Sequence, residues 1–304
     1  MADVKDRLSK GLSETRTVVL GAQILFGFQY EAVFAARFKD LAPWATTLHI
    51  SAFAAMLAAL VVVIAPTPFH RISEGGRATP RQTSLISLAM MGTLVLFGLA
   101  VGASVAVATS VVLQPWAAGG LGAAATAAAA FSWFGVELMQ KRPPRERTPQ
   151  TPQDLPLKEK IAQLLTEARL VLPGVQALLG FQFTAYLTEA FGKLDRFSQG
   201  VHTASLILLL TAMVLLMTPA PYHRLGERGE DTPRAERVSQ IMVIAALVPL
   251  AAALGADFYV AVRMVSGSAT VAGWSAATAV AAAALLWFAF PVAGRVARKA
   301  AEGG

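Results

Sequence analysis

The chain repeats itself at a fixed spacing of 153 residues, and this duplication constrains the fold more than any other feature of the sequence. The four histidines form two such pairs, His49 with His202 and His70 with His223. Over residues 23–81 the match with the second copy runs without a gap, at roughly a third identity. A repeated set of polar residues, rather than shared hydrophobicity alone, indicates that one structural unit occurs twice.

The composition predicts an integral membrane protein. Hydrophobic residues make up 55% of the 304 residues and charged residues only 15%, against roughly 25% charged in soluble domains. The apolar runs are close to the ~20 residues that are needed to cross a hydrocarbon core. They predict eight membrane spans, at residues 17–38, 44–65, 83–112, 116–139, 170–191, 198–218, 238–263 and 271–292.

We therefore expect an all-α membrane bundle made of two four-helix repeats. An even number of spans places both repeats the same way up, so they are parallel and related by a pseudo-two-fold axis along the membrane normal. The expected parts are a tail at 1–16, repeat 1 at 17–139, a charged and Pro-rich cytoplasmic linker at 140–169, repeat 2 at 170–293 and a tail at 294–304. Within the linker, residues 157–165 are expected to form a short amphipathic helix on the membrane surface.

The basic residues predict the orientation in the membrane. If the N terminus is cytoplasmic, 21 of the 26 Lys and Arg side chains lie on that side. The five outside are Arg37, Lys39, Lys193, Arg196 and Arg263. We therefore expect a bacterial inner-membrane protein with both termini in the cytoplasm. The same bias explains the formal charge of +7, so anionic lipid headgroups on the cytoplasmic face are the expected partners and nucleic acid is not.

Glutamines recur in the first span of each repeat, at Gln23 and Gln29 and again at Gln176 and Gln182. An unpaired amide in hydrocarbon costs at least ~2 kcal/mol, so these side chains are expected to face other helices. They either hold the helices together through hydrogen bonds or line a polar path through the bundle.

Each repeat also carries an acid and a histidine at similar depth. Glu31 and Glu189 lie toward the outer end of the first span, and His49 and His202 lie about one turn inside the second. Spans that are joined by a short loop are neighbours, so contacts of Glu31 with His49 and of Glu189 with His202 are plausible. Such pairs could exchange a proton near physiological pH. In the alternative interpretation the acids reach the headgroups and the histidines cap helix ends.

Two charged residues near the outer end of the seventh span have no charged twins. Asp257 is matched by Ser104, and Arg263 is matched by Trp116. We interpret Asp257 and Arg263 as interfacial residues and expect no functional role for them.

The densest motif is P-x-P-[FY]-H-R-[IL]-x-E-x-G-x-x-T-P-R, at residues 66–81 and 219–234. Its two prolines are expected to stop the helix, and Gly76 and Gly229 to allow a tight turn. Thr79 and Thr232 are expected to cap the next helix, with proline at its first position.

The other polar residues of this motif are candidates for a site on the cytoplasmic face. They are His70, Arg71, Glu74 and Arg81 in the first copy, and His223, Arg224, Glu227 and Arg234 in the second. One possibility is a clamp in which Glu74 pairs with Arg71 or Arg81 and holds the loop. The other is an anion site for a phosphate or a lipid headgroup.

The pattern G-F-Q-x-x-A, a central histidine and then P-x-P-[FY]-H-R-[IL] resembles an uncharacterised bacterial multi-pass membrane family. It is a domain of unknown function whose usual member is a single four-helix unit, so the resemblance covers both halves of this chain. Some members of that family are labelled as sodium:proton antiporters. The resemblance thus implies a duplicated four-helix unit, and the family carries no established activity to transfer to this chain.

The favoured function is a proton-linked transporter or channel for a cation or a small solute. Glu31, His49, Glu189 and His202 would be its titratable sites, and the four glutamines would line the deeper path. The alternative is a non-transporting scaffold or lipid-binding regulator that acts through the cytoplasmic His-Arg loops. An enzyme is not expected, because the HExxH, GxSxG and Walker motifs are absent, and neither a metal nor a cofactor is expected. Oligomerisation is compatible with either function.

Overall fold

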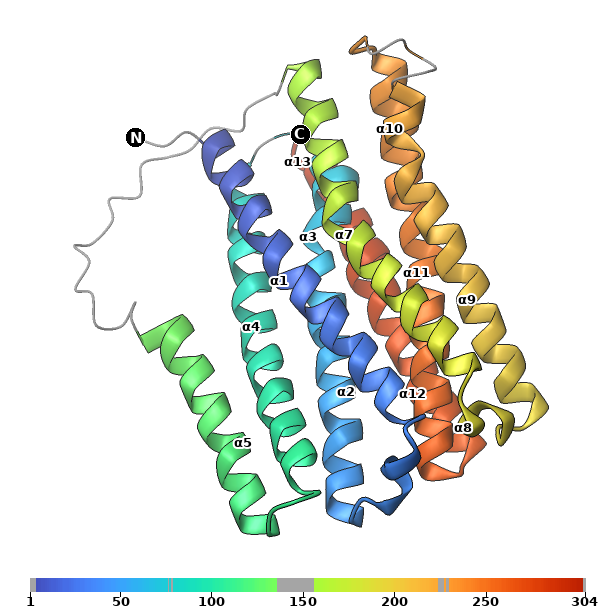
Figure 1. Ribbon diagram of the computed structural model, residues 1–304. Coiled ribbons are helices and arrows are strands. Elements are labelled where there is room, and N and C mark those ends of the chain that lie inside the picture. Colours follow the sequence, from blue (N-terminus) through green and yellow to red (C-terminus); the bar gives the residue numbers. More distant parts are fainter. Residues whose placement is uncertain are drawn as a thin grey trace.

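The computed structural model describes residues 4–75, 77, 79–135, 156–223, 227 and 230–302, and within these residues the chain forms helices and loops without a strand (Figure 1). The helices of the first half are α1 (Val4–Ala32), η1 (Ala36–Asp40), α2 (Pro43–Ile64), α3 (Pro66–Pro68), η2 (Phe69–Ser73), α4 (Pro80–Thr109), α5 (Pro115–Ala130) and η3 (Phe131–Gly135). Those of the second half are α7 (Leu157–Tyr186), α8 (Glu189–Gly192), α9 (Arg196–Met217), α10 (Pro219–Pro221), α11 (Pro233–Ser266), α12 (Ala269–Ala284), η5 (Leu285–Ala289) and α13 (Phe290–Glu302).

The duplication is visible in the helix bounds and in the packing. Helices α2 and α9 begin and end at positions that are 153 residues apart, as do α3 and α10. In the first half α1 contacts α2 and α4, while α4 contacts α2 and α5. The second half has the same set, in which α7 contacts α9 and α11, while α11 contacts α9 and α12. Helices α1 and α7 pack against each other and join the halves.

Six helical runs in the described part of the chain are long and apolar enough to cross a membrane. They are Pro43–Ser73, Pro80–Thr109, Leu157–Tyr186, Arg196–Pro221, Pro233–Ser266 and Ala269–Ala300. The expected spans 17–38 and 116–139 fall on α1 and α5 and are not among these six. Helix α1 starts in a charged segment, α5 is rich in alanine and glycine, and residues 136–139 lie outside the described ones. The six runs are compatible with a membrane-embedded protein.

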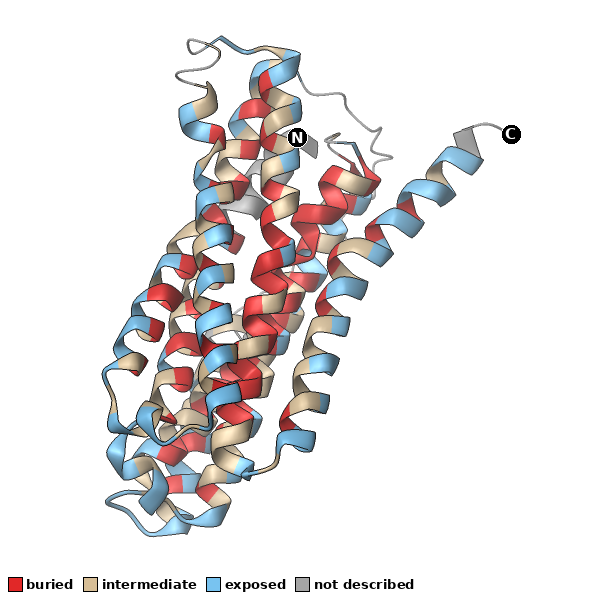
Figure 2. Ribbon diagram, turned by 90° about the vertical axis from the view of Figure 1, so that its right-hand side faces the viewer, coloured by how far each residue is buried: buried red, intermediate tan, exposed pale blue. Residues whose placement is uncertain are grey.

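The two ends of the bundle differ. Helices α1 and α13 bring the first and last described residues to the same end, here called the terminal end (Figure 1). The loops with η1 and α8 lie at the opposite end. Figure 2 shows the buried positions gathered on the inward faces of the helices and the C-terminal helix leaning away from the bundle.

The structure corrects the expectation for residues 157–165 and adds detail to the segment after the second repeat. Residues 157–165 are not a separate surface helix but the first turns of α7, because Ile161 and Leu164 are buried in the bundle. The expected tail at 294–304 is helical as far as Glu302 and continues α12 through the π-helical turn η5. This last helix packs against η2. Residues 136–155, which include most of the expected linker, lie outside the described part.

The repeated loop motif was predicted correctly at its end and wrongly at its start. Thr79 accepts a hydrogen bond from the Gln82 amide (3.1 Å), and its twin Thr232 caps α11 in the same way. The prolines, however, do not stop the helix, because Ala65 stays in the helical region and the run continues through α3 and η2. Gly75 has a positive φ of 59°, whereas Gly76 and Gly229 lie outside the described residues.

Close packing of α1 against α7 joins the two halves. A side chain at Gly27 would collide with the Phe181 ring, and one at Gly174 would collide with Gln23. Gln23 also donates to the carbonyl oxygen of Val171 (3.3 Å). Small residues at such crossings let helix backbones approach closely. The hydrophobic core is accordingly one cluster that includes residues of both halves.

The glycine twins at this contact give a direct test of the packing. We expect Gly27→Ala to destabilise the protein by about 1–3 kcal/mol, because the added methyl group overpacks the joint at Phe181. The matched control is Gly180→Ala, which places the same group in open space and is expected to be neutral or to stabilise by up to about 1 kcal/mol. Thermal unfolding in detergent measures both. Equal shifts in the midpoint would contradict this packing.

Candidate functional site

The structure does not form the two predicted acid–histidine pairs. The Nε2 atom of His49 donates to the Gln29 carbonyl oxygen (2.9 Å), while Glu31 is half-buried in the last turn of α1. Glu189 begins α8 with a side chain that is 95% exposed, 4.0 Å from the ammonium group of Lys193. Helix α1 reaches Ala32 and so contains Glu31 at its outer end as predicted, whereas α7 ends at Tyr186 and leaves Glu189 on the separate helix α8.

Both halves instead share a hydrogen bond from a histidine ring to the backbone carbonyl group of a glutamine. His202 donates from Nε2 to the Gln182 carbonyl oxygen (3.3 Å), the counterpart of the bond from His49 to Gln29. Both histidines are buried, at 0% and 4% exposed. In each half the second helix is thereby tied to the backbone of the first.

The four glutamines do not line one path. Gln23 lies at the joint between α1 and α7, and Gln29 donates to the Ser104 hydroxyl (2.9 Å). Gln176 is exposed on α7, because that position faces away from the bundle, so its predicted inward orientation is wrong. Gln182 is fully buried.

Gln182 belongs to a polar cluster around Asp257, which the sequence analysis had given no role. Asp257 is 1% exposed on α11, so its side chain packs among other helices instead of reaching the protein surface. Its Oδ1 atom accepts from Gln182 Nε2 (2.5 Å) and from the Ser205 hydroxyl (2.7 Å). Three helices, α7, α9 and α11, therefore meet at one carboxyl oxygen.

Two oxygen atoms of this cluster are buried without a hydrogen-bond partner in the described structure, Asp257 Oδ2 and Gln182 Oε1. An ionised carboxylate with an unsatisfied oxygen is costly in an apolar interior. A bound proton or a small cation at Oδ2 would remove that cost. The cluster thus has the donor set of a proton or cation site.

Aromatic side chains enclose the histidine of the same cluster. Because Nε2 of His202 donates to Gln182, its Nδ1 is the acceptor of the Tyr30 hydroxyl (2.6 Å). The Tyr30 ring lies nearly parallel to the imidazole, with 10° between the ring planes, and the rings of Phe34, Tyr186 and Phe191 lie around it. Tyr30 and Phe34 come from the first half and the other rings from the second, so the cluster is completed across the duplication.

A signal for this cluster was present in the sequence. Gln29 and Ser104 are 75 residues apart, as are Gln182 and Asp257, and both pairs are hydrogen-bonded. If the contact of Ser104 with Gln29 is known, the duplication predicts that Asp257 lies beside Gln182. Sequence alone did not give that first contact.

At the terminal end, the first His-Arg loop is buried instead of facing the surface. Arg71 donates from Nε to Glu167 of α7 (2.8 Å), and both side chains are nearly inaccessible, at 1% and 0% exposed. His70 is 1% exposed and Glu74 is 5% exposed. The guanidinium group of Arg81 lies over the Phe69 ring, 5.0 Å from its centroid. Among the described residues the predicted pairing of Glu74 with Arg71 or Arg81 is therefore not formed, because Arg71 is held by the other half.

The second loop is held by its own acid. Glu227 accepts from the Tyr222 hydroxyl and from the Thr232 hydroxyl, each at 2.9 Å. The bond from Tyr222 holds the pKa of the Glu227 carboxyl below its ordinary value, and the same bond raises the pKa of the Tyr222 phenol. The charge of Arg234 adds to the lowering at Glu227 and offsets part of the rise at Tyr222. His223 lies 3.3 Å from Asp231. Arg224 lies outside the described residues.

Taken together, the helices and the polar cluster define a class: an all-helical protein with several candidate membrane spans and a buried acid between them. Residues 4–137 and 154–291 each match a family of unknown function, DUF6328. The chain belongs to this family and carries its unit twice. No curated protein and no solved structure matches the chain.

The Arg71–Glu167 pair is suited to a double-mutant cycle. We expect Arg71→Met or Glu167→Met alone to destabilise the protein by about 3–5 kcal/mol, because each leaves an uncompensated buried charge. The double variant should lose much less free energy of unfolding than the two single variants added together, since an apolar pair leaves no buried charge without a partner. Thermal unfolding in detergent measures all three. Additive losses would contradict the pairing.

Proposed function

We propose that this protein is a proton-linked membrane transporter or channel for a cation or a small solute, and that Asp257 is its titratable group. The observation that carries this proposal is the buried Oδ2 atom of Asp257, which has no partner while Oδ1 is held by Gln182 and Ser205. Ionisable side chains inside membrane spans are rare and costly, and they commonly mark ion and proton pathways.

The chemistry of the cluster supports a bound proton. Protonation at Oδ2 removes the charge and creates an O–H donor beside Gln182, whose Oε1 atom is also without a partner. A carboxylic acid and a carboxamide can then join through two hydrogen bonds, one in each direction. A small cation between the same two oxygens would neutralise the acid in the same way. Release of the proton or the cation restores the unfavourable charge on Asp257. The free and bound states of the site therefore differ in the charge of this carboxyl group.

The depth of the acid supports exchange with the opposite end of the bundle. Asp257 precedes the end of α11 at Ser266 by about 14 Å of helix, but follows its start at Pro233 by about 36 Å. His202 and Tyr30, which adjoin the cluster, lie on the same side of the bundle centre. These groups replace Glu31 and Glu189 as the best-supported sites for a titrating proton.

The membrane arrangement is part of the same proposal. All eight long helices cross the membrane, and the halves are related by a pseudo-two-fold axis along its normal. The common helix bounds and the common packing order support this arrangement. The positive-inside bias places the terminal end in the cytoplasm of a bacterial cell, at the inner membrane. The antiporter label of some members of the resembled family agrees with a proton-linked function.

The alternative, a scaffold or regulator that binds lipid headgroups through its His-Arg loops, has less support. A headgroup site needs accessible cations, whereas His70 and Arg71 are buried and Arg71 is already paired. Such a function would have to rest on the second loop.

Proton flux in proteoliposomes tests the proposal. A pH-sensitive dye inside the vesicles reports flux under an imposed sodium, potassium or proton gradient. We expect flux with the wild-type protein and only the rate of empty vesicles with Asp257→Asn, because asparagine keeps the shape but cannot hold the proton. Two variants serve as controls and should retain flux: Glu31→Gln with Glu189→Gln, and Ser104→Ala at the twin position of Asp257.

Two results would overturn the proposal. Flux that survives Asp257→Asn shows that the acid is not the carrier. A wild-type protein that is silent under every gradient shows that it does not conduct or exchange these ions. Equal thermal unfolding midpoints for the variants and the wild type would show that any loss of flux is not a folding defect.

A further inference from the structure

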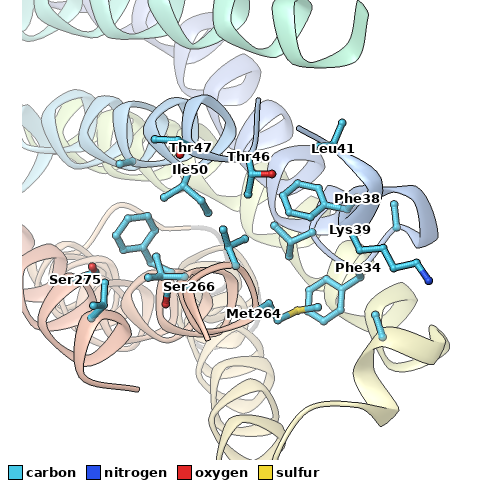
Figure 3. Close-up of a pocket in the computed structure, with 18 of the residues that line it drawn as sticks. Phe34, Phe38, Lys39, Leu41, Thr46, Thr47, Ile50, Met264, Ser266 and Ser275 are labelled. Carbon is cyan, nitrogen blue, oxygen red and sulfur yellow. The ribbon is translucent and has the colours of Figure 1, made fainter. Parts of the chain in front are cut away.

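A large cavity lies between the two halves at the opposite end of the bundle (Figure 3). Its volume is about 1620 Å³, which exceeds the ~300–1,000 Å³ that is common for small-molecule pockets. Helices α2, α11 and α12 form its walls, while η1 and α8 border its mouth. The polar side chains of the cluster around Asp257 do not line it, whereas Phe34, which packs against His202, does.

The depth of the cavity matches one leaflet of a bilayer. Its lining on α2 runs from Pro43 to Ala54, which is about 16 Å of helix. Half of a ~30 Å hydrocarbon core is about 15 Å. The deep walls include Ile50, Phe258 and Val262 and are apolar. An extended hydrocarbon chain therefore fits the cavity along the membrane normal.

Most hydroxyl groups of the wall, all except that of Ser275, donate to backbone carbonyl groups nearby in the chain and so leave the wall largely apolar. Six lining hydroxyls do so: Thr46, Thr47, Ser51, Thr188, Ser266 and Thr278. A sugar or another polar solute would find their donor hydrogens already used. The wall consequently favours an acyl chain over a polar ligand.

Positive charge gathers at the mouth of the cavity. Lys39 and Lys193 line it, together with Glu189, and in Figure 3 the ammonium group of Lys39 points away from the apolar residues. Only five of the 26 basic residues are expected at this end, and two of them border this cavity. Lys193 and Glu189 are 4.0 Å apart and highly exposed, so their mutual attraction is weak and the lysine can contact an anion.

The cavity also extends to the outside of the bundle. Trp274 and Val271 of α12 line it and are 73% and 51% exposed. In a membrane those side chains face lipid, so a lipid can enter from the side without crossing the bundle. Trp at this level is typical of the membrane interface.

We infer that this cavity binds one anionic phospholipid of the leaflet at the opposite end, with an acyl chain along α2 and α12 and the phosphate beside Lys39 and Lys193. The bound chain rests on Phe34 and Phe258, which line the cavity and contact His202 and Phe53 on their other sides. This site is distinct from the proton site and from the His-Arg loops at the terminal end.

Photo-crosslinking tests the inference. The full-length protein in nanodiscs is exposed to phosphatidylglycerol that carries a diazirine in its acyl chain, irradiated, digested and mapped by mass spectrometry. We expect labels to concentrate on residues 43–54 and 271–278. Ala54→Trp fills the cavity and should remove most of this label. Its twin Ile207→Trp, on an exposed face of α9 outside the cavity, should leave the label unchanged.

The headgroup is tested with the same readout. We expect Lys39→Ala with Lys193→Ala to reduce labelling by the phosphatidylglycerol probe severalfold, and Arg37→Ala with Arg196→Ala, at the same end but outside the lining, to leave it intact. A phosphatidylcholine probe should label wild type weakly. Even labelling of all lipid-facing helices that Ala54→Trp does not reduce would overturn the site. Equal labelling of the wild type by both lipid probes would overturn the anionic headgroup. So would labelling of the lysine variant by the phosphatidylglycerol probe at the wild-type level. None of these readouts depends on proton flux.

Discussion

The close contact of α1 with α7 is the interaction on which the rest of the structure depends. Gly27 and Gly174 let each helix accept a large side chain of the other, and the Gln23 amide spans the joint. This contact merges two hydrophobic cores into one and fixes the depth of α1 against the second half. Tyr30, which lies one turn after Gly27, is thereby held against His202. The packing of α1 against α7 therefore both joins the two halves and helps to enclose the buried cluster around Asp257.

Local signals in the sequence predicted local structure well. The Thr-Pro pairs that begin α4 and α11 were predicted because a cap depends only on neighbouring residues. The all-helical fold, the duplication and most of the apolar runs followed from periodicity and length. The prolines at 66 and 68 misled, because helix termination there depends on whether tertiary packing holds Ala65 in the helical region.

The candidate site was harder to predict, because burial of a polar residue is decided by helices that are distant in sequence. Asp257 appeared interfacial when α11 was considered alone, whereas α7 and α9 enclose it. His202 was identified, but its partners were not, because they depend on how α1 docks beside α9. Arg71 shows the same dependence, since its partner Glu167 lies on a helix of the other half. Duplication helped only where one copy already supplied a contact that could be carried to the other.

The two copies share a frame and differ in their polar detail. Each ties a histidine to the backbone of a glutamine, but the first places Ser104 where the second has Asp257, and Ala52 where the second has Ser205. A pair of identical four-helix chains could not show this difference, because every substitution would appear in both. Fusion into one polypeptide allows this acid to be present once, at Asp257, with serine at the equivalent position 104. The stoichiometry of any ligand at that acid is therefore set by the gene as one for each full chain.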